Sequence, residues 1–103
     1  MKYIKAQKQG IEIEYKVFGN KAYIFSNLSY IKDSFIKLMA KKGSRVQEIK
    51  DSNWVMIRIP DKDKPEGEQF DLTESENIKA EEEIANFLVN NLETGGFEVV
   101  ELK

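Results

Sequence analysis

The sequence predicts a single α+β domain, because it contains two kinds of hydrophobic periodicity in one short chain. Residues 11–18 and 21–26 alternate apolar and polar side chains, as half-buried strands do. Residues 28–42 and 76–94 repeat apolar side chains at helical spacing. The length of 103 residues suits one domain with one core. We therefore expect residues 1–103 to form one antiparallel or mixed sheet of about six strands, with both helices packed on one face.

The first three strands are predicted to form two hairpins. Gly19-Asn20 is a two-residue hairpin turn, because glycine adopts a positive φ without steric cost. A further strand over residues 2–7 precedes the alternating segments, and matching of apolar faces sets its register. The expected cross-strand pairs are Val17 with Ala22, Tyr15 with Ile24, Ile4 with Tyr15, and Ala6 with Ile13.

Both helices carry end signals. Ser26 or Asn27 is expected to cap the first helix, and Gly43 suits the position after its last turn. Thr73 and Glu76 have the spacing of a capping box at the start of the second helix. The buried stripes are expected to be Leu28, Ile31, Phe35, Leu38 and Met39 on the first helix, and Ile78, Ala85, Leu88, Val89 and Leu92 on the second.

The remaining elements complete the order βββαββ(β)αβ. They are a hairpin of residues 45–50 and 54–60, an exposed loop over 61–69, a short strand over 70–72, and a closing strand over 97–102 after Gly95-Gly96.

The composition argues against an enzyme and against a metal or cofactor. The chain has no His and no Cys, so the commonest general base, metal ligand and thiol nucleophile are absent. The segment 61–72 has a faint likeness to a calcium loop, but Pro65, Glu66 and Leu72 occupy positions where the EF-hand needs other residues. We expect no catalysis, no metal and no cofactor.

Apolar runs of signal-peptide or membrane-span length are absent, so a cytoplasmic location without membrane association is expected. Fourteen Lys against two Arg, with eleven Ile and seven Asn, is typical of AT-rich genomes such as those of many bacteria, phages and plasmids. The small size and the lack of catalytic groups suggest an inhibitor or adaptor from such a source.

Charge is distributed unevenly along the chain. Residues 1–50 carry a net charge of +7, and residues 51–103 carry −9. Separate basic and acidic surfaces would follow if each half folded by itself. The charges would mix instead if strands from both halves shared the sheet.

The first functional hypothesis is a non-catalytic module that binds another protein, such as a nucleic-acid enzyme, through its acidic segment. Residues 61–83 contain ten acidic residues and three lysines, a field able to steer association with a basic groove. The alternative is a solvated loop and helix start, where acidic residues are favoured anyway. The candidate partner-binding residues are Asp61, Asp63, Glu66, Glu68, Asp71, Glu74 and Glu76.

The second hypothesis is nucleic-acid binding by the other face of the first strands. Lys16 is expected opposite Tyr23, and Glu14 opposite Phe25, which places aromatic rings among lysines. The same surface would suit a protein interface, or Phe18 and Phe25 would be core residues under a further element. The candidate residues are Lys5, Lys16, Lys21, Tyr23, Lys37 and Lys41.

Two arginines in the whole chain argue against sequence-specific DNA recognition, because arginine is the preferred reader of base edges. A third hypothesis is self-association, with basic and acidic ends meeting head to tail.

Overall fold

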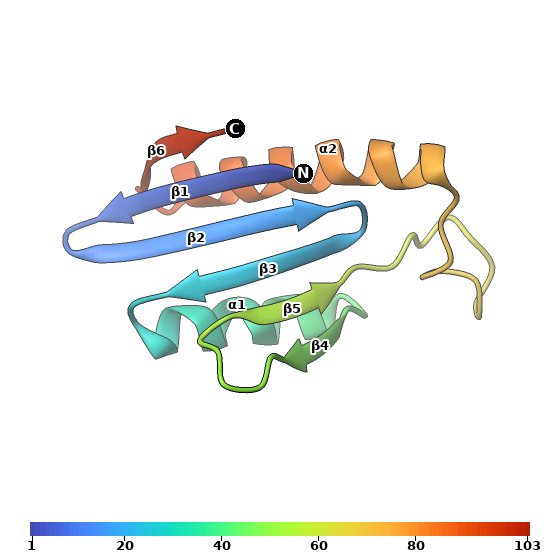
Figure 1. Ribbon diagram of the computed structural model, residues 1–103, viewed down its shortest axis with the longest axis horizontal. Coiled ribbons are helices and arrows are strands. Elements are labelled where there is room, and N and C mark those ends of the chain that lie inside the picture. Colours follow the sequence, from blue (N-terminus) through green and yellow to red (C-terminus); the bar gives the residue numbers. More distant parts are fainter.

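The computed structural model describes residues 1–103 as one antiparallel sheet of six strands with two helices (Figure 1). The strands run in the spatial order β4-β5-β3-β2-β1-β6. The α+β prediction is confirmed. The elements are β1 (Lys2–Lys8), β2 (Ile11–Phe18), β3 (Lys21–Ser26), α1 (Ser29–Lys41), β4 (Arg45–Glu48), β5 (Val55–Arg58), α2 (Glu74–Thr94) and β6 (Glu98–Leu102).

The predicted register of the central strands is confirmed. The Gly19-Asn20 turn joins β2 to β3, and Gly19 has a φ of 56°. Since the side-chain period of a strand is two, a correct register assigns every residue to the correct face. The observed pairs include Val17 with Ala22, Tyr15 with Ile24, Ile4 with Tyr15, and Ala6 with Ile13.

The two helices cover the same face of the sheet, side by side. Fifteen buried side chains form one core cluster, to which both helices and four of the strands contribute. The Phe35 ring of α1 lies 5.4 Å from the Tyr15 ring of β2, and Leu88 of α2 is completely buried. Burial raises the pKa of the Tyr15 hydroxyl. The opposite face of the sheet therefore carries no helix.

The start of α2 is as predicted, and the start of α1 is not. Thr73 and Glu76 form a complete capping box. The residue at the N-cap of α1 is Leu28, not Ser26 or Asn27, and no side chain caps that helix. The Ser26 hydroxyl accepts a hydrogen bond from the Leu28 N–H at 3.2 Å, and the Asn27 amide bonds to the backbone of the preceding hairpin instead.

Three further expectations were wrong. Leu38, expected in the buried stripe of the first helix, is 39% exposed, because Phe35 and Met39 are the residues of α1 that reach the core. Residues 70–72 form no strand, because they cross the end of the sheet and do not run along an edge.

Ile78 is 66% exposed, although it lies at the helical spacing of the buried stripe. At this end of α2 the contact with the sheet is made by Asn77 and Glu81, which accept hydrogen bonds from the Asn20 and Gly19 N–H groups, so Ile78 lies outside that contact.

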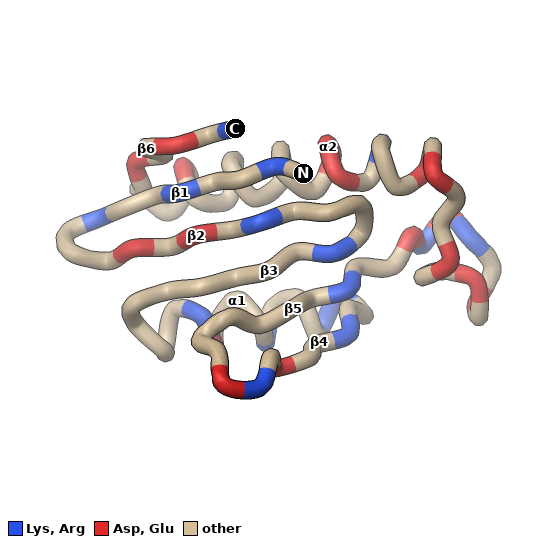
Figure 2. The backbone as a smooth tube through the Cα atoms, viewed as in Figure 1, with Lys and Arg blue, Asp and Glu red and all other residues tan.

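The basic and acidic halves of the sequence interleave. The acidic β6 pairs with the basic β1, and β5 from the second half lies between β3 and β4 from the first. Figure 2 shows acidic residues along α2 and the loop before it, while lysines and arginines gather across β2, β3, β5 and β4. Neither helix has the apolar composition that a membrane span requires.

Candidate functional site

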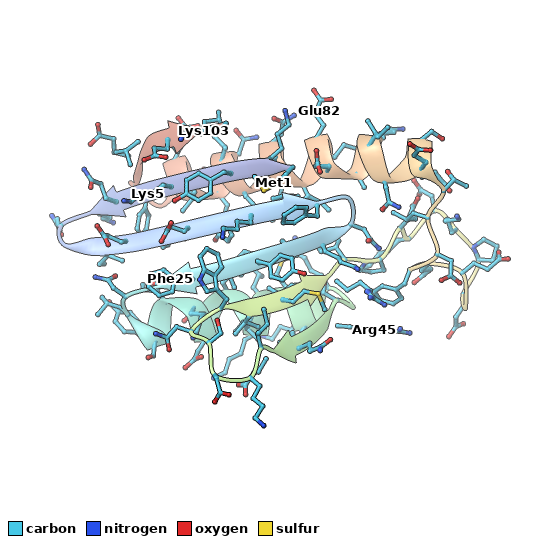
Figure 3. All side chains as sticks on the ribbon, in the orientation of Figure 1. Met1, Lys5, Phe25, Arg45, Glu82 and Lys103 are labelled. Carbon is cyan, nitrogen blue, oxygen red and sulfur yellow. The ribbon has the colours of Figure 1, made fainter.

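The helix-free face of the sheet, called here the open face, is the first candidate site. Every second residue of β1, β2, β3 and β5 points to it, because buried residues on the side of α1 and α2 alternate with them. Figure 3 views the molecule from this side, with Lys5, Phe25 and Arg45 spread over it. The strand registers sort these residues into rows that cross several strands.

The last row at one end of the open face contains three cations beside Phe18 of β2. Lys21 on β3 lies opposite Arg58 on β5, and Arg58 lies opposite Arg45 on β4. None of the three forms a salt bridge. Like charges directly opposite each other on neighbouring strands are destabilising, so this cationic row is an electrostatic cost that no salt bridge offsets.

An aromatic cluster, formed by Tyr23, Phe25 and Trp54, begins in the row next to the cationic row. The Phe25 and Trp54 rings are 5.6 Å apart, and the Lys16 ammonium lies 4.6 Å from the centre of the Trp54 ring. Tyr23 lies between Lys16 and Met56 in the adjacent row, and its ring makes an edge-on contact with Phe18 at 5.8 Å. The cross-strand pairs predicted from the sequence, Lys16 with Tyr23 and Glu14 with Phe25, are confirmed.

The far part of the open face is acidic and is partly occupied by internal contacts. Tyr3 donates a short hydrogen bond to the Glu14 carboxylate. That bond, with burial and the charges of Glu14 and Glu101, raises the pKa of the Tyr3 hydroxyl to about 12. Lys5 lies between Glu14 and Glu101 in the register. The free positive charge is therefore concentrated at the end that carries the cationic row.

A buried asparagine holds this end of the sheet to the rest of the molecule. Asn20 is only 7% exposed, and its amide donates to the backbone carbonyls of Ile59 and Phe70 at 3.4 and 3.5 Å. Its backbone N–H donates to the side chain of Asn77 on α2 at 3.3 Å. Phe70 is thereby placed against the guanidinium of Arg45, 4.0 Å from ring centre to cation.

Beside this junction lies a shallow pocket of about 460 Å³, called here the sheet-end pocket. It joins the cationic row to the segment that leads into α2. Its lining residues are Asn20, Lys21, Arg58, Phe70, Asp71, Leu72, Thr73 and Asn77.

The predicted basic set is divided by the fold. Lys5, Lys16, Lys21 and Tyr23 all lie on the open face. Lys37 and Lys41 lie on α1, on the other side of the sheet, and cannot act with them. Sequence reasoning missed Arg45, Arg58, Trp54 and Phe70.

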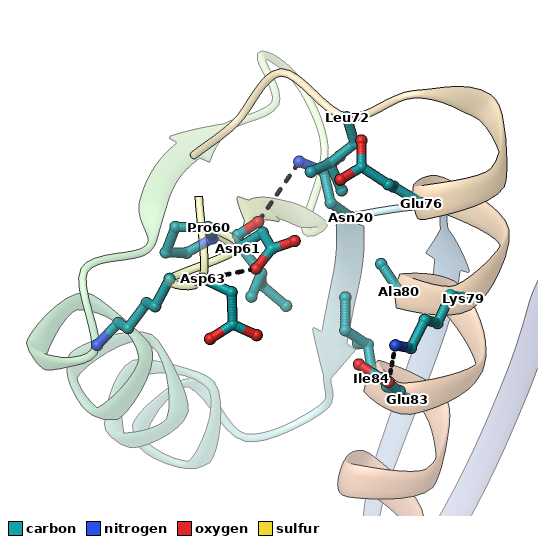
Figure 4. Close-up of a pocket in the computed structure, with 12 residues that line it drawn as sticks. Asn20, Pro60, Asp61, Asp63, Leu72, Glu76, Lys79, Ala80, Glu83 and Ile84 are labelled. Atoms are coloured by element: carbon teal, nitrogen blue, oxygen red, sulfur yellow. Dashed lines mark hydrogen bonds and ion pairs between the residues drawn. The ribbon is translucent and has the colours of Figure 1, made fainter. Parts of the chain in front are cut away.

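The predicted acidic set does not form a single row either. Asp61, Asp63 and Glu76 line a cleft of about 370 Å³ between α2 and the segment after β5 (Figure 4). Asp71 lines the sheet-end pocket, whereas Glu66, Glu68 and Glu74 are exposed. Lys62 and Lys79 also line the cleft, so its charge is mixed.

Two members of the acidic set have structural roles. The Asp61 carboxylate accepts the Asp63 N–H at 3.0 Å. The Glu76 carboxylate accepts the Thr73 N–H and the Lys64 ammonium, both at 2.9 Å. These contacts, the Thr73 backbone first, lower the pKa of Glu76 to about 2. Lys64 also donates to the Asp71 carbonyl, which ties the loop to the start of α2.

The described residues contain no group of three or more His, Cys, Asp or Glu side chains that could hold a metal ion. Comparisons with protein-family models, with curated proteins and with solved structures give no match to this chain. The site is therefore argued from its own geometry.

Proposed function

We propose that the protein is a non-catalytic module that binds single-stranded nucleic acid across its open face. The observation that carries the proposal is the adjacency of the cationic row to the aromatic cluster. Cations neutralise phosphates, and exposed aromatic rings stack with unpaired bases of any sequence. Lys21, Arg58 and Arg45 are the cations, and Tyr23, Phe25 and Trp54 are partly exposed aromatic residues.

The two arginines support phosphate binding by the cationic row. A guanidinium forms bidentate hydrogen bonds with phosphate oxygens, which a lysine ammonium cannot do. Both arginines of the chain lie in the cationic row, on adjacent strands. A bound phosphate would offset the repulsion between them, so ligand binding and relief of that repulsion reinforce each other.

The test is the binding of a labelled oligothymidylate, followed by fluorescence anisotropy at low and at physiological salt. The double variant Lys21→Gln/Arg58→Gln should weaken binding at least about tenfold, and should lower the salt slope by about 1.4, from two lost phosphate contacts. The matched control is Lys37→Gln/Lys41→Gln, which removes the same charge from α1. Equal losses in both variants would reject the open face as the binding site.

A second candidate function is protein binding by the acidic segment, as an inhibitor or adaptor that occupies a basic groove. It is supported by Glu66, Glu68 and Glu74, which are exposed and form no salt bridge. Partners captured by the wild-type protein and lost on changing Glu66, Glu68 and Glu74 to Gln would support this function. Partners lost only with the open-face variant would contradict it.

A further inference from the structure

We infer that the sheet-end pocket is a site for the terminal phosphate monoester of a nucleic-acid strand. This inference rests on the proposed function, since it names the part of the ligand that this end of the open face would hold. Lys21 and Arg58 line the pocket on one side, and Phe70 and Asn77 line it on the other.

The position of the pocket favours a strand end. Lys21 is the first residue of β3 and Arg58 is the last residue of β5, so no further row of the open face follows them. Beyond them lies the segment Phe70–Thr73, which Asn20 and Asn77 hold in place. A strand that crosses the aromatic cluster therefore meets a wall after the cationic row.

The pair of cations in the pocket matches the two charges of a monoester. A phosphate monoester carries close to two negative charges at neutral pH, and an internal phosphodiester carries one. Lys21 and Arg58 provide two positive charges and neither forms a salt bridge, while the exposed Asp71 reduces the net charge of the lining to +1. Arg45 lies against the Phe70 ring and keeps that wall in place instead of entering the pocket.

Asp71 is the one carboxylate in the pocket lining. Its replacement and that of Arg58 should change phosphate affinity in opposite directions. The charge of Asp71 opposes that of an incoming phosphate. The variant Asp71→Asn should therefore tighten phosphate binding severalfold, whereas Arg58→Gln should weaken it.

The experiment compares oligothymidylates with a 5′-phosphate, with a 3′-phosphate and with two hydroxyl ends, by anisotropy. One of the two phosphorylated oligothymidylates should bind about tenfold more tightly than the oligothymidylate with two hydroxyl ends, because charge-assisted bidentate contacts are strong. The preference should vanish in Arg58→Gln and persist in the control Lys37→Gln. Equal affinity for all three oligonucleotides would overturn the inference while leaving the proposed function intact.

A second measurement separates the two proposals. Inorganic phosphate is titrated into the isotope-labelled protein without any oligonucleotide, and backbone amide shifts are recorded by NMR. Saturable shifts at Lys21, Arg58 and Asn77 that Arg58→Gln abolishes would support the pocket even if no oligonucleotide bound. Amide shifts spread over all the lysines, or no shifts at all, would overturn the inference of a phosphate site in this pocket.

Discussion

Arg45 and Arg58, the only arginines in the chain, lie directly opposite each other on β4 and β5, and Lys21 extends the row onto β3. Cross-strand pairs of like charge are unfavourable by roughly 0.2–1 kcal/mol each. Their presence on a face without a covering helix is the feature that the proposed function explains.

The repulsion can be measured without any ligand. Arg58→Gln should keep or raise the free energy of unfolding at low salt, because it removes two like-charge pairs. Added salt should stabilise the wild-type protein more than the variant, since screening weakens repulsion. Urea denaturation at two salt concentrations checks both points. A variant that is less stable at low salt, with the same salt response as the wild type, would show that the row is not repulsive.

The capping box makes stability depend on pH in the acid range. The pKa of Glu76 is lowered from 4.5 to about 2 in the folded protein, so its stabilising contribution is present above pH 4.5 and is lost as the pH falls toward 2. Glu76→Gln should remove that contribution at neutral pH and flatten the fall of the unfolding free energy over this range. Glu66→Gln, an exposed carboxylate outside the box, is the control. Identical acid profiles for the two variants would contradict this role of Glu76.

Gly19 should be far less replaceable than Gly10, although both have positive φ. An added Cβ at Gly19 would lie 2.6 Å from the Asn77 amide oxygen, whereas nothing lies within 4 Å of one at Gly10. Both Ala variants suffer backbone strain. Gly19→Ala should lose at least about 1 kcal/mol more, because the contact between the turn and α2 must shift. Equal thermal and chemical stability of the two variants would contradict the junction at Asn20 and Asn77.

The face of α2 that packs on the sheet can be tested in the same way. Leu88→Ala should cost about 2–5 kcal/mol, because the side chain is fully buried and its removal leaves a cavity. Ile78→Ala should change the unfolding free energy by no more than about 0.5 kcal/mol, because Ile78 is mostly exposed. A loss of similar size in Ile78→Ala would support the stripe that helical spacing alone predicts, in which both residues are buried.

The strand pairing of the sheet could be predicted where a specified turn and the alternation of apolar and polar residues together determine the register. Gly19-Asn20 determines which residues of β2 and β3 face each other, and apolar matching extends this to β1. Ile78 was assigned wrongly because helical spacing says which side chains share a face and not how far the sheet extends beneath them.

The cationic row could not be predicted, because its register depends on a turn that the sequence does not specify. A three-residue turn over 51–53 would pair Lys50 with Trp54, and therefore Arg45 with Ile59. The observed connection is longer, and Glu48 pairs with Val55. That shift of one residue brings Arg45 opposite Arg58. The contact of Arg45 with Phe70 depends in turn on the buried side chain of Asn20, which sequence reasoning saw only as a turn residue.

The most direct test of the account uses Trp54, the only tryptophan in the chain, which lies in the aromatic cluster on the open face. Oligothymidylate is titrated at low salt while the intrinsic fluorescence of Trp54 is followed. If bases stack on this cluster, the emission should be quenched saturably, and the quenching should be reversed by salt and weakened by Lys21→Gln/Arg58→Gln. If the emission stays unchanged at low salt and no binding of the oligonucleotide is detected, the proposal that the open face binds single strands is contradicted.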